Sequence, residues 1–73
     1  MGFCITVPEI NDFPCAEVWC NIENEKEALA AAEVALGYTA WNVACTIKEL
    51  GPEFFAEIGL PVGHVSIRPK TSE

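Results

Sequence analysis

The sequence predicts a small α+β sandwich of the order β-β-α-β-(short α)-β, with one mixed sheet and its helices on one face. Two observations predict this class: residues 3–7 alternate as a strand does, and residues 24–37 carry the spacing and caps of a helix. The chain has 73 residues, 51% of them hydrophobic, which is too apolar for intrinsic disorder. We therefore expect a single domain, 1–73, with a frayed tail at 69–73.

Two strands are expected first. Residues 3–7 alternate between apolar and polar side chains and end at Pro8, turn-forming residues 11–14 follow, and residues 15–22 alternate again. Neighbouring strands joined by a short loop predict an antiparallel hairpin. The side chains expected to face inward are those of Phe3, Ile5, Val7, Ala16, Val18, Cys20 and Ile22. Those expected to face outward include Cys4, Thr6, Glu17, Trp19 and Asn21.

The clearest element is a helix between Asn24 and Gly37. Asn24 is a favoured N-cap, and Glu27 stands three positions later, as in a capping box. Gly37 suits a left-handed C-cap. The apolar stripe between the caps consists of Ala28, Leu29, Ala32, Ala35 and Leu36. Because three of these five are alanine, we expect the helix to lie close to the sheet.

Residues 39–48 fit a strand or a helix. Alternation and β-branched residues favour the strand, which would turn Trp41, Val43, Cys45 and Ile47 inward and Asn42, Thr46 and Lys48 outward. Residues 15–47 would then form a right-handed parallel crossover.

A short helix, Pro52–Ile58, should follow between Gly51 and Gly59, because proline suits the first helical position and glycine the exit. Its buried side is expected to consist of Phe54, Phe55 and Ile58. The last strand is expected at 62–68, with His64, Ser66 and Arg68 facing outward.

Charge narrows the classes of partner. Eleven acids against four bases give a net charge of −7, and seven of these acids lie between residues 9 and 33. Such a surface repels phosphate backbones and anionic membranes, so we expect no direct nucleic-acid or membrane binding. A negative field attracts basic proteins, many of which themselves bind nucleic acid. An ordinary solubilising role for the charge is the alternative.

The first functional hypothesis is a small intracellular, cytoplasmic binding protein that inhibits or neutralises a basic, nucleic-acid-acting partner, as antitoxins or phage-borne inhibitors of host defence do. Its carboxylates would occupy Lys and Arg sites that otherwise hold phosphates. The charges proposed for this surface are Glu9, Asp12, Glu17, Glu23, Glu25, Glu27 and Glu33. The apolar anchors are Trp19 and Phe13.

Two segments strengthen that class. Asp12-Phe13-Pro14-Cys15, followed by Glu27-Ala28-Leu29 and Ala35-Leu36, resembles the start of HicB-type antitoxins, which have a strand pair and then a helix with a Glu-Ala-Leu repeat. The resemblance covers about a third of the chain. The chain lacks the glycine expected after Pro14, its loop is longer, and a strand follows in place of a second binding domain. The resemblance implies an acidic, partner-neutralising protein.

Other chemistry has little support in the sequence. The one histidine, His64, is expected to be a surface residue, no glycine-rich phosphate loop follows a strand, and no Cys-x-x-Cys pair occurs. We therefore expect no enzyme activity and no cofactor or metal, with the four cysteines as thiols. A metal or thiol site formed by Cys4, Cys15, Cys20, Cys45 and His64 is the third hypothesis, after the two binding functions. A chain of this length also has little room for a ligand cleft. The alternative function is a structural subunit that forms a homodimer or a larger complex through its outer sheet face.

Overall fold

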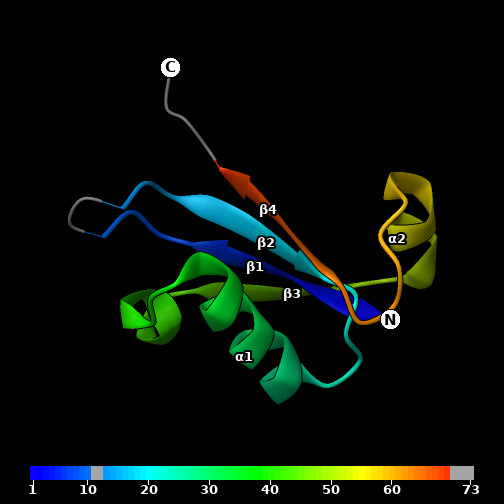
Figure 1. Ribbon diagram of the computed structural model, residues 1–73, viewed down its shortest axis with the longest axis horizontal. Helices are drawn as coiled ribbons and strands as arrows, with labels where there is room; N and C mark the ends of the chain where they lie inside the picture. Colours follow the sequence, from blue (N-terminus) through cyan, green and yellow to red (C-terminus); the bar gives the residue numbers. More distant parts are fainter. Residues whose placement is uncertain (11–12, 70–73) are drawn as a thin grey trace.

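The computed structural model of the protein describes residues 1–10 and 13–69. Its elements are β1 (Gly2–Val7), β2 (Ala16–Cys20), α1 (Glu25–Leu36), a 3-10 helix (Ala40–Val43), β3 (Thr46–Leu50), α2 (Pro52–Ile58) and β4 (Val65–Pro69). The four strands form one sheet, α1 lies across one of its faces, and α2 stands at one end (Figure 1). The predicted α+β class is confirmed.

The sheet is antiparallel at each of its junctions, which corrects the predicted mixed sheet. The strand order is β3-β1-β2-β4, and all three neighbouring pairs are antiparallel. Because β2 and β3 both run against β1, they point in the same direction, as the predicted crossover requires. β1 lies between them, so the crossover joins strands that are not hydrogen-bonded to each other.

The hairpin of β1 and β2 has the predicted alternation. Ile5 pairs with Val18 and Phe3 with Cys20, and all four side chains are buried on the face that α1 covers. A register slip of one residue would turn these apolar side chains to solvent, so their burial specifies the register. Ile22, also expected inward, follows β2 and packs against the same core.

Both predicted caps of α1 are confirmed. The Asn24 side chain accepts a hydrogen bond from the backbone N–H of Glu27 at 3.1 Å, and Gly37 ends the helix with a φ of 86°. Ala28 and Ala32 are fully buried, and α1 packs on β1, β2 and β4. Because their side chains are single methyl groups, the helix lies close to the sheet.

The strand predicted at 39–48 is wrong over its first half. Residues 40–43 form a 3-10 helix from which Trp41 fills the core, and β3 begins only at Thr46. The indole N–H of Trp41 donates to the carbonyl of Tyr38 at 2.7 Å, so the ring is buried with its polar atom paired. Val43, predicted to face inward, is 95% exposed. Alternation between Trp41 and Cys45 is therefore not strand periodicity.

The predicted span of α2 is confirmed, but its two phenylalanines do not share one buried side as predicted. Phe55 is buried and lies so close to Gly2 that a Cβ there would meet its ring. Phe54 turns toward Trp19, on the face opposite α1. The two neighbouring aromatic rings thus close the end of the sheet and reach the face that α1 leaves uncovered.

The last strand is shorter at its start than predicted, because His64 lies in the turn before β4. Asn21, predicted to face outward, is buried, and its side-chain Nδ2 donates to the Leu60 carbonyl at 2.8 Å. Its backbone N–H donates to His64 O and its carbonyl accepts from Gly63 N–H. Asn21 therefore anchors the loop between α2 and β4. Of the predicted tail, Pro69 closes β4, and residues 70–73 lie outside the described residues.

Candidate functional site

The sheet face opposite α1 carries the candidate site. Outward-facing residues of the four strands lie side by side in two cross-strand rows set by the register. The first row is Thr46, Thr6, Glu17 and Arg68, and the second is Lys48, Cys4, Trp19 and Ser66. We call this surface the open sheet face. The alternation in the sequence correctly predicted that Cys4, Thr6, Glu17 and Trp19 face outward. It also predicted this correctly for Thr46 and Lys48.

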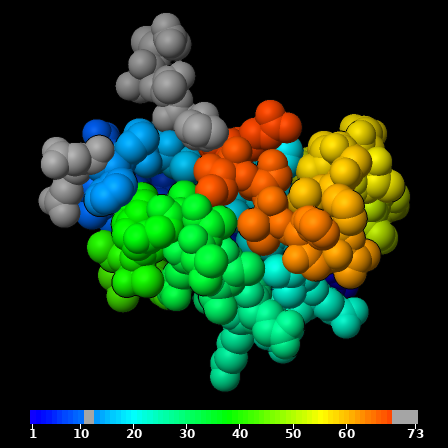
Figure 2. Space-filling model, viewed as in Figure 1, coloured from blue at the N-terminus to red at the C-terminus, as the bar shows by residue number. Residues whose placement is uncertain are grey.

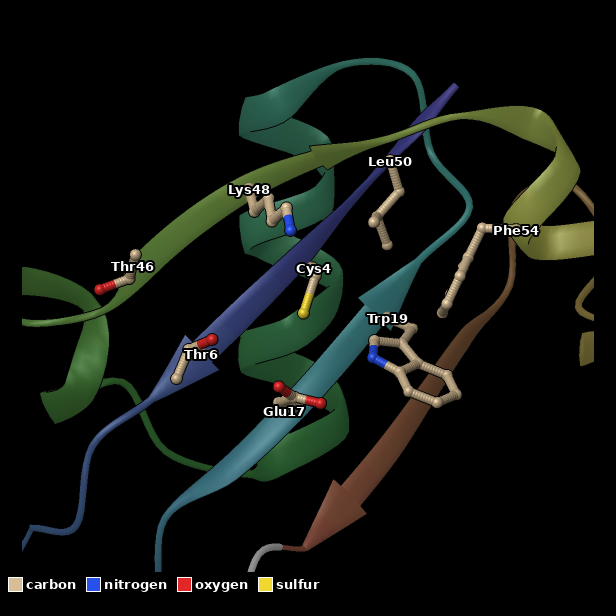
Figure 3. A pocket seen from close by; sticks show the side chains of 8 residues that line it. All are labelled: Cys4, Thr6, Glu17, Trp19, Thr46, Lys48, Leu50 and Phe54. Carbon is tan, nitrogen blue, oxygen red and sulfur yellow. The ribbon is translucent and has the colours of Figure 1, made fainter.

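A groove of about 310 Å³ runs over this face. Such a volume is at the lower limit of the roughly 300–1,000 Å³ of small-molecule sites, which agrees with the expectation that the chain has little room for a ligand cleft. Figure 3 shows the groove with Cys4 at its centre, the two threonines at one end and the apolar side chains at the other. Its lining consists of Cys4, Thr6, Glu17, Trp19, Thr46, Lys48, Leu50 and Phe54.

Trp19 is held in place from two directions. The Phe54 ring meets it edge-on, with centroids 5.0 Å apart at 89°, and Arg68 Cζ lies 4.8 Å from the centroid of the indole. The edge-on and cation–π contacts each stabilise one ring orientation. Trp19 is therefore half-buried between Phe54 of α2 and Arg68 of β4. It forms a rigid apolar wall of the groove.

The charge of the open sheet face differs from that of the whole chain. Lys48 lines the groove from β3, Arg68 lies over Trp19, and Glu17 lies between them in the strand order. These are two of the three lysines and arginines in the described residues, and the third is Lys26 in α1. Cations therefore outnumber carboxylates here, on a chain whose net charge is −7.

Most of the predicted site residues lie elsewhere. Glu23, Glu25 and Glu27 are each exposed at the start of α1, with Lys26 between the last two, on the side of the sheet away from the groove. Figure 2 looks onto the α1 face, where the segment leading into α1 and its first turn (teal) project at the lower edge. We call these three residues the acidic corner. The sheet separates them from Glu17.

The remaining predicted charges are dispersed. Glu9 is exposed in the loop after β1, and Glu33, half-buried on α1, accepts a hydrogen bond from Asn42 Nδ2. Asp12 lies outside the described residues. The predicted carboxylates therefore do not form one continuous surface with Glu17.

The two predicted apolar anchors are also apart. Phe13 is 45% exposed and stacks on Tyr38, with ring centroids 4.0 Å apart and planes 16° from parallel. Tyr38 follows the C-cap of α1, whereas Trp19 contacts Phe54 of α2. Phe13 and Trp19 thus belong to different surfaces.

Two groove residues were missed from the sequence. Leu50 lies beyond the predicted strand, although it continues the alternation of Thr46 and Lys48. Phe54 was assigned to the buried side of the short helix. Extending the strand by two residues would have found Leu50, but no local pattern separates Phe54 from Phe55.

The thiols of Cys20, which is buried, and Cys45, which is half-buried, are poor nucleophiles at neutral pH. Burial, and then the neighbouring Cys4, raise the pKa of Cys20 from 9.0 to about 11. Burial also raises the pKa of Cys45, and more than its backbone hydrogen bond lowers it. The Cys20 thiol donates to the Ala28 carbonyl at 3.6 Å, and no disulfide joins any two of the four cysteines, which all lie in the described ranges. Cys20 therefore packs as a small apolar residue.

This raised pKa predicts alkaline destabilisation. Between pH 9 and 11 the unfolded chain loses the Cys20 proton while the folded chain keeps it, so the free energy of unfolding should fall by up to about 2–3 kcal/mol. Urea unfolding at pH 8, 9, 10 and 11 measures the fall. Because other groups also titrate, the Cys20→Ala variant is the control, and its decline should be shallower. Parallel declines in the two proteins would contradict the assignment.

Residues 1–10 and 13–69 contain neither a metal-binding cluster nor a membrane-spanning helix. No group of three or more His, Cys, Asp or Glu side chains there is placed to hold a metal ion. His64 is exposed in a turn. Within the same ranges no helix has the length and apolar character needed to cross a membrane.

Comparison with known proteins gives no assignment. No family model matches the chain, and no curated protein and no solved structure matches it either. The protein class implied by the resemblance of residues 12–36 to HicB-type antitoxins stays a prediction.

Proposed function

We propose that this protein is a small acidic, non-enzymatic binding protein that docks on a basic partner protein and blocks a surface with which that partner binds nucleic acid. This is the role of antitoxins and of phage-borne anti-defence inhibitors such as anti-CRISPR proteins. The observation that carries the proposal is the acidic corner, three exposed carboxylates within five residues on a chain with a net charge of −7.

The acidic corner is well suited to bind cations. Glu25 and Glu27 belong to the first turn of α1, whose backbone the Asn24 cap holds in one conformation. A rigid backbone lowers the entropy lost when carboxylates bind a Lys or Arg surface. The net charge would speed the encounter with a basic partner, and charge-assisted hydrogen bonds to guanidinium groups would hold it.

Charge reversal tests this proposal. We expect the double variant Glu23→Lys/Glu25→Lys to weaken binding to the basic partner by at least about tenfold for each reversed charge. The partner is captured from the native source and identified by mass spectrometry, and its dissociation constant is then measured by calorimetry. The fold is checked by circular dichroism.

The matched control is Glu53→Lys/Glu57→Lys, which makes the same change in net charge on the exposed surface of α2. It should leave most of the affinity. An equal loss in both double variants would mean that net charge alone acts, and an unchanged affinity in both would remove the electrostatic basis of the proposal.

One observation supports a second candidate function, a subunit that self-associates. The open sheet face is covered by no helix of the described residues apart from the contact of Phe54. Light scattering at low and high salt separates the two candidates. A dimer that persists at both salt concentrations favours the subunit, whereas a monomer at both favours the acidic binding protein.

The thiols bear on the compartment. Cys20 and Cys45 are free, which suits a reducing compartment such as the cytoplasm.

A further inference from the structure

We propose that the groove on the open sheet face binds a small zwitterion with an apolar side chain, namely a free apolar α-amino acid. This site goes beyond the proposed function, because it uses the opposite face of the sheet from the acidic corner. Three properties of the groove carry the inference: its pair of opposite charges, its apolar end and its hollow shape.

The charges select a zwitterion. Lys48 comes from β3 on one side of Cys4, and Glu17 from β2 on the other (Figure 3). Lys48, together with the nearby Arg68, repels a simple cation, and Glu17 opposes a simple anion. An α-amino acid carries both charges on neighbouring atoms. Its carboxylate would lie against the Lys48 ammonium and its own ammonium against the Glu17 carboxylate.

The apolar end selects the side chain. Leu50, Phe54 and Trp19 gather at one end of the groove, away from the two threonines (Figure 3). Trp19 is already oriented by Phe54 and Arg68, so a ligand would order little of this wall on binding. At the other end the hydroxyls of Thr6 and Thr46 can donate to a carboxylate. Leucine-like or phenylalanine-like side chains fit this division.

The hollow shape disfavours a second copy as the occupant. A twofold dimer whose axis passes through the groove would place the same hollow opposite itself and leave both grooves unfilled. An internal peptide segment has neutral backbone amides and lacks the paired charges. A free amino acid fits the volume, which is at the lower limit for small ligands. Because the groove is open on one side, we expect a dissociation constant on the order of 1 mM.

Titration of the isotope-labelled chain tests the site. L-phenylalanine and L-leucine should shift the backbone amide resonances of Cys4, Thr6, Trp19 and Lys48 in a saturable manner. Two analogues that each lack one charge, 3-phenylpropionate and 2-phenylethylamine, should bind at least about tenfold more weakly, and glycine should bind more weakly than either amino acid. Equal binding of phenylalanine and both analogues, or no shift up to about ten times the expected constant, would overturn the proposal.

A charge deletion locates the binding. Lys48→Met keeps most of the side-chain length and removes the charge, and it should weaken L-phenylalanine binding at least about tenfold. The control, Lys26→Met on α1, should leave it unchanged. Equal effects of the two variants would overturn the site. If the amide resonances of the groove residues shifted with protein concentration in the absence of any amino acid, a second copy of the chain would occupy the groove. That result would also overturn the proposal. Neither lysine belongs to the acidic corner, so failure here leaves the proposed function standing.

Discussion

Replacing Trp41 with alanine is expected to lower the free energy of unfolding by about 3–5 kcal/mol. The side chain is fully buried and is among the largest in the core. Its loss removes apolar contacts, leaves a cavity under the sheet, and deprives the Tyr38 carbonyl of its indole donor. A domain of this size has a total stability of roughly 4–11 kcal/mol, so the variant should be partly unfolded under mild conditions.

Urea unfolding followed by circular dichroism measures the effect. Val43→Ala is the matched control, because Val43 belongs to the same 3-10 helix and is 95% exposed, and its stability should change by less than about 0.5 kcal/mol. The loss of stability in Trp41→Phe should lie between those of Trp41→Ala and Val43→Ala, because phenylalanine keeps most of the apolar surface but cannot make the hydrogen bond. Equal stabilities of Trp41→Ala and Val43→Ala would contradict the burial of Trp41 in the core.

Replacing Gly2 with alanine is expected to cost about 2–3 kcal/mol. A Cβ at this position would stand 2.3 Å from the Cys20 carbonyl oxygen and 2.6 Å from Cζ of Phe55. The carbonyl belongs to β2, which pairs with both β1 and β4, so it cannot move away without disturbing two strand pairs. Relief would also require Phe55 to leave its buried position against the end of the sheet.

Gly51→Ala is the control for that substitution. Gly51 has an ordinary φ of −80°, and the one atom within 4 Å of an added Cβ is the Glu53 carboxylate oxygen, at the end of a flexible exposed side chain. Its cost should stay below about 1 kcal/mol, mainly from a weaker helix start. Thermal unfolding of both variants compares the two glycines. Equal melting temperatures would contradict the close packing of α2 against β1.

The acidic corner could be predicted more fully than the groove. Glu23, Glu25 and Glu27 are close together because they are close in the chain, and one capped helix turn is enough to expose them. The groove draws residues from three strands and from α2, so only the strand order brings Lys48, Glu17 and Phe54 to one face. Placing Glu17 and Trp19 outward was correct, but assigning Glu17 to one surface with the acidic corner was wrong, because alternation does not say which helix covers which face.

Local patterns were sufficient for the hairpin, for α1 with both caps and for the span of α2, since each depends on interactions between residues near in sequence. They were insufficient for residues 40–45, where burial of a single indole outweighs strand propensity. They were also insufficient for the sheet, because whether β1 lies between β2 and β3 depends on contacts across the whole chain. Short-range hydrogen bonding and side-chain periodicity are written in consecutive residues, whereas strand order and the covering of each sheet face follow from how the assembled elements bury apolar surface together.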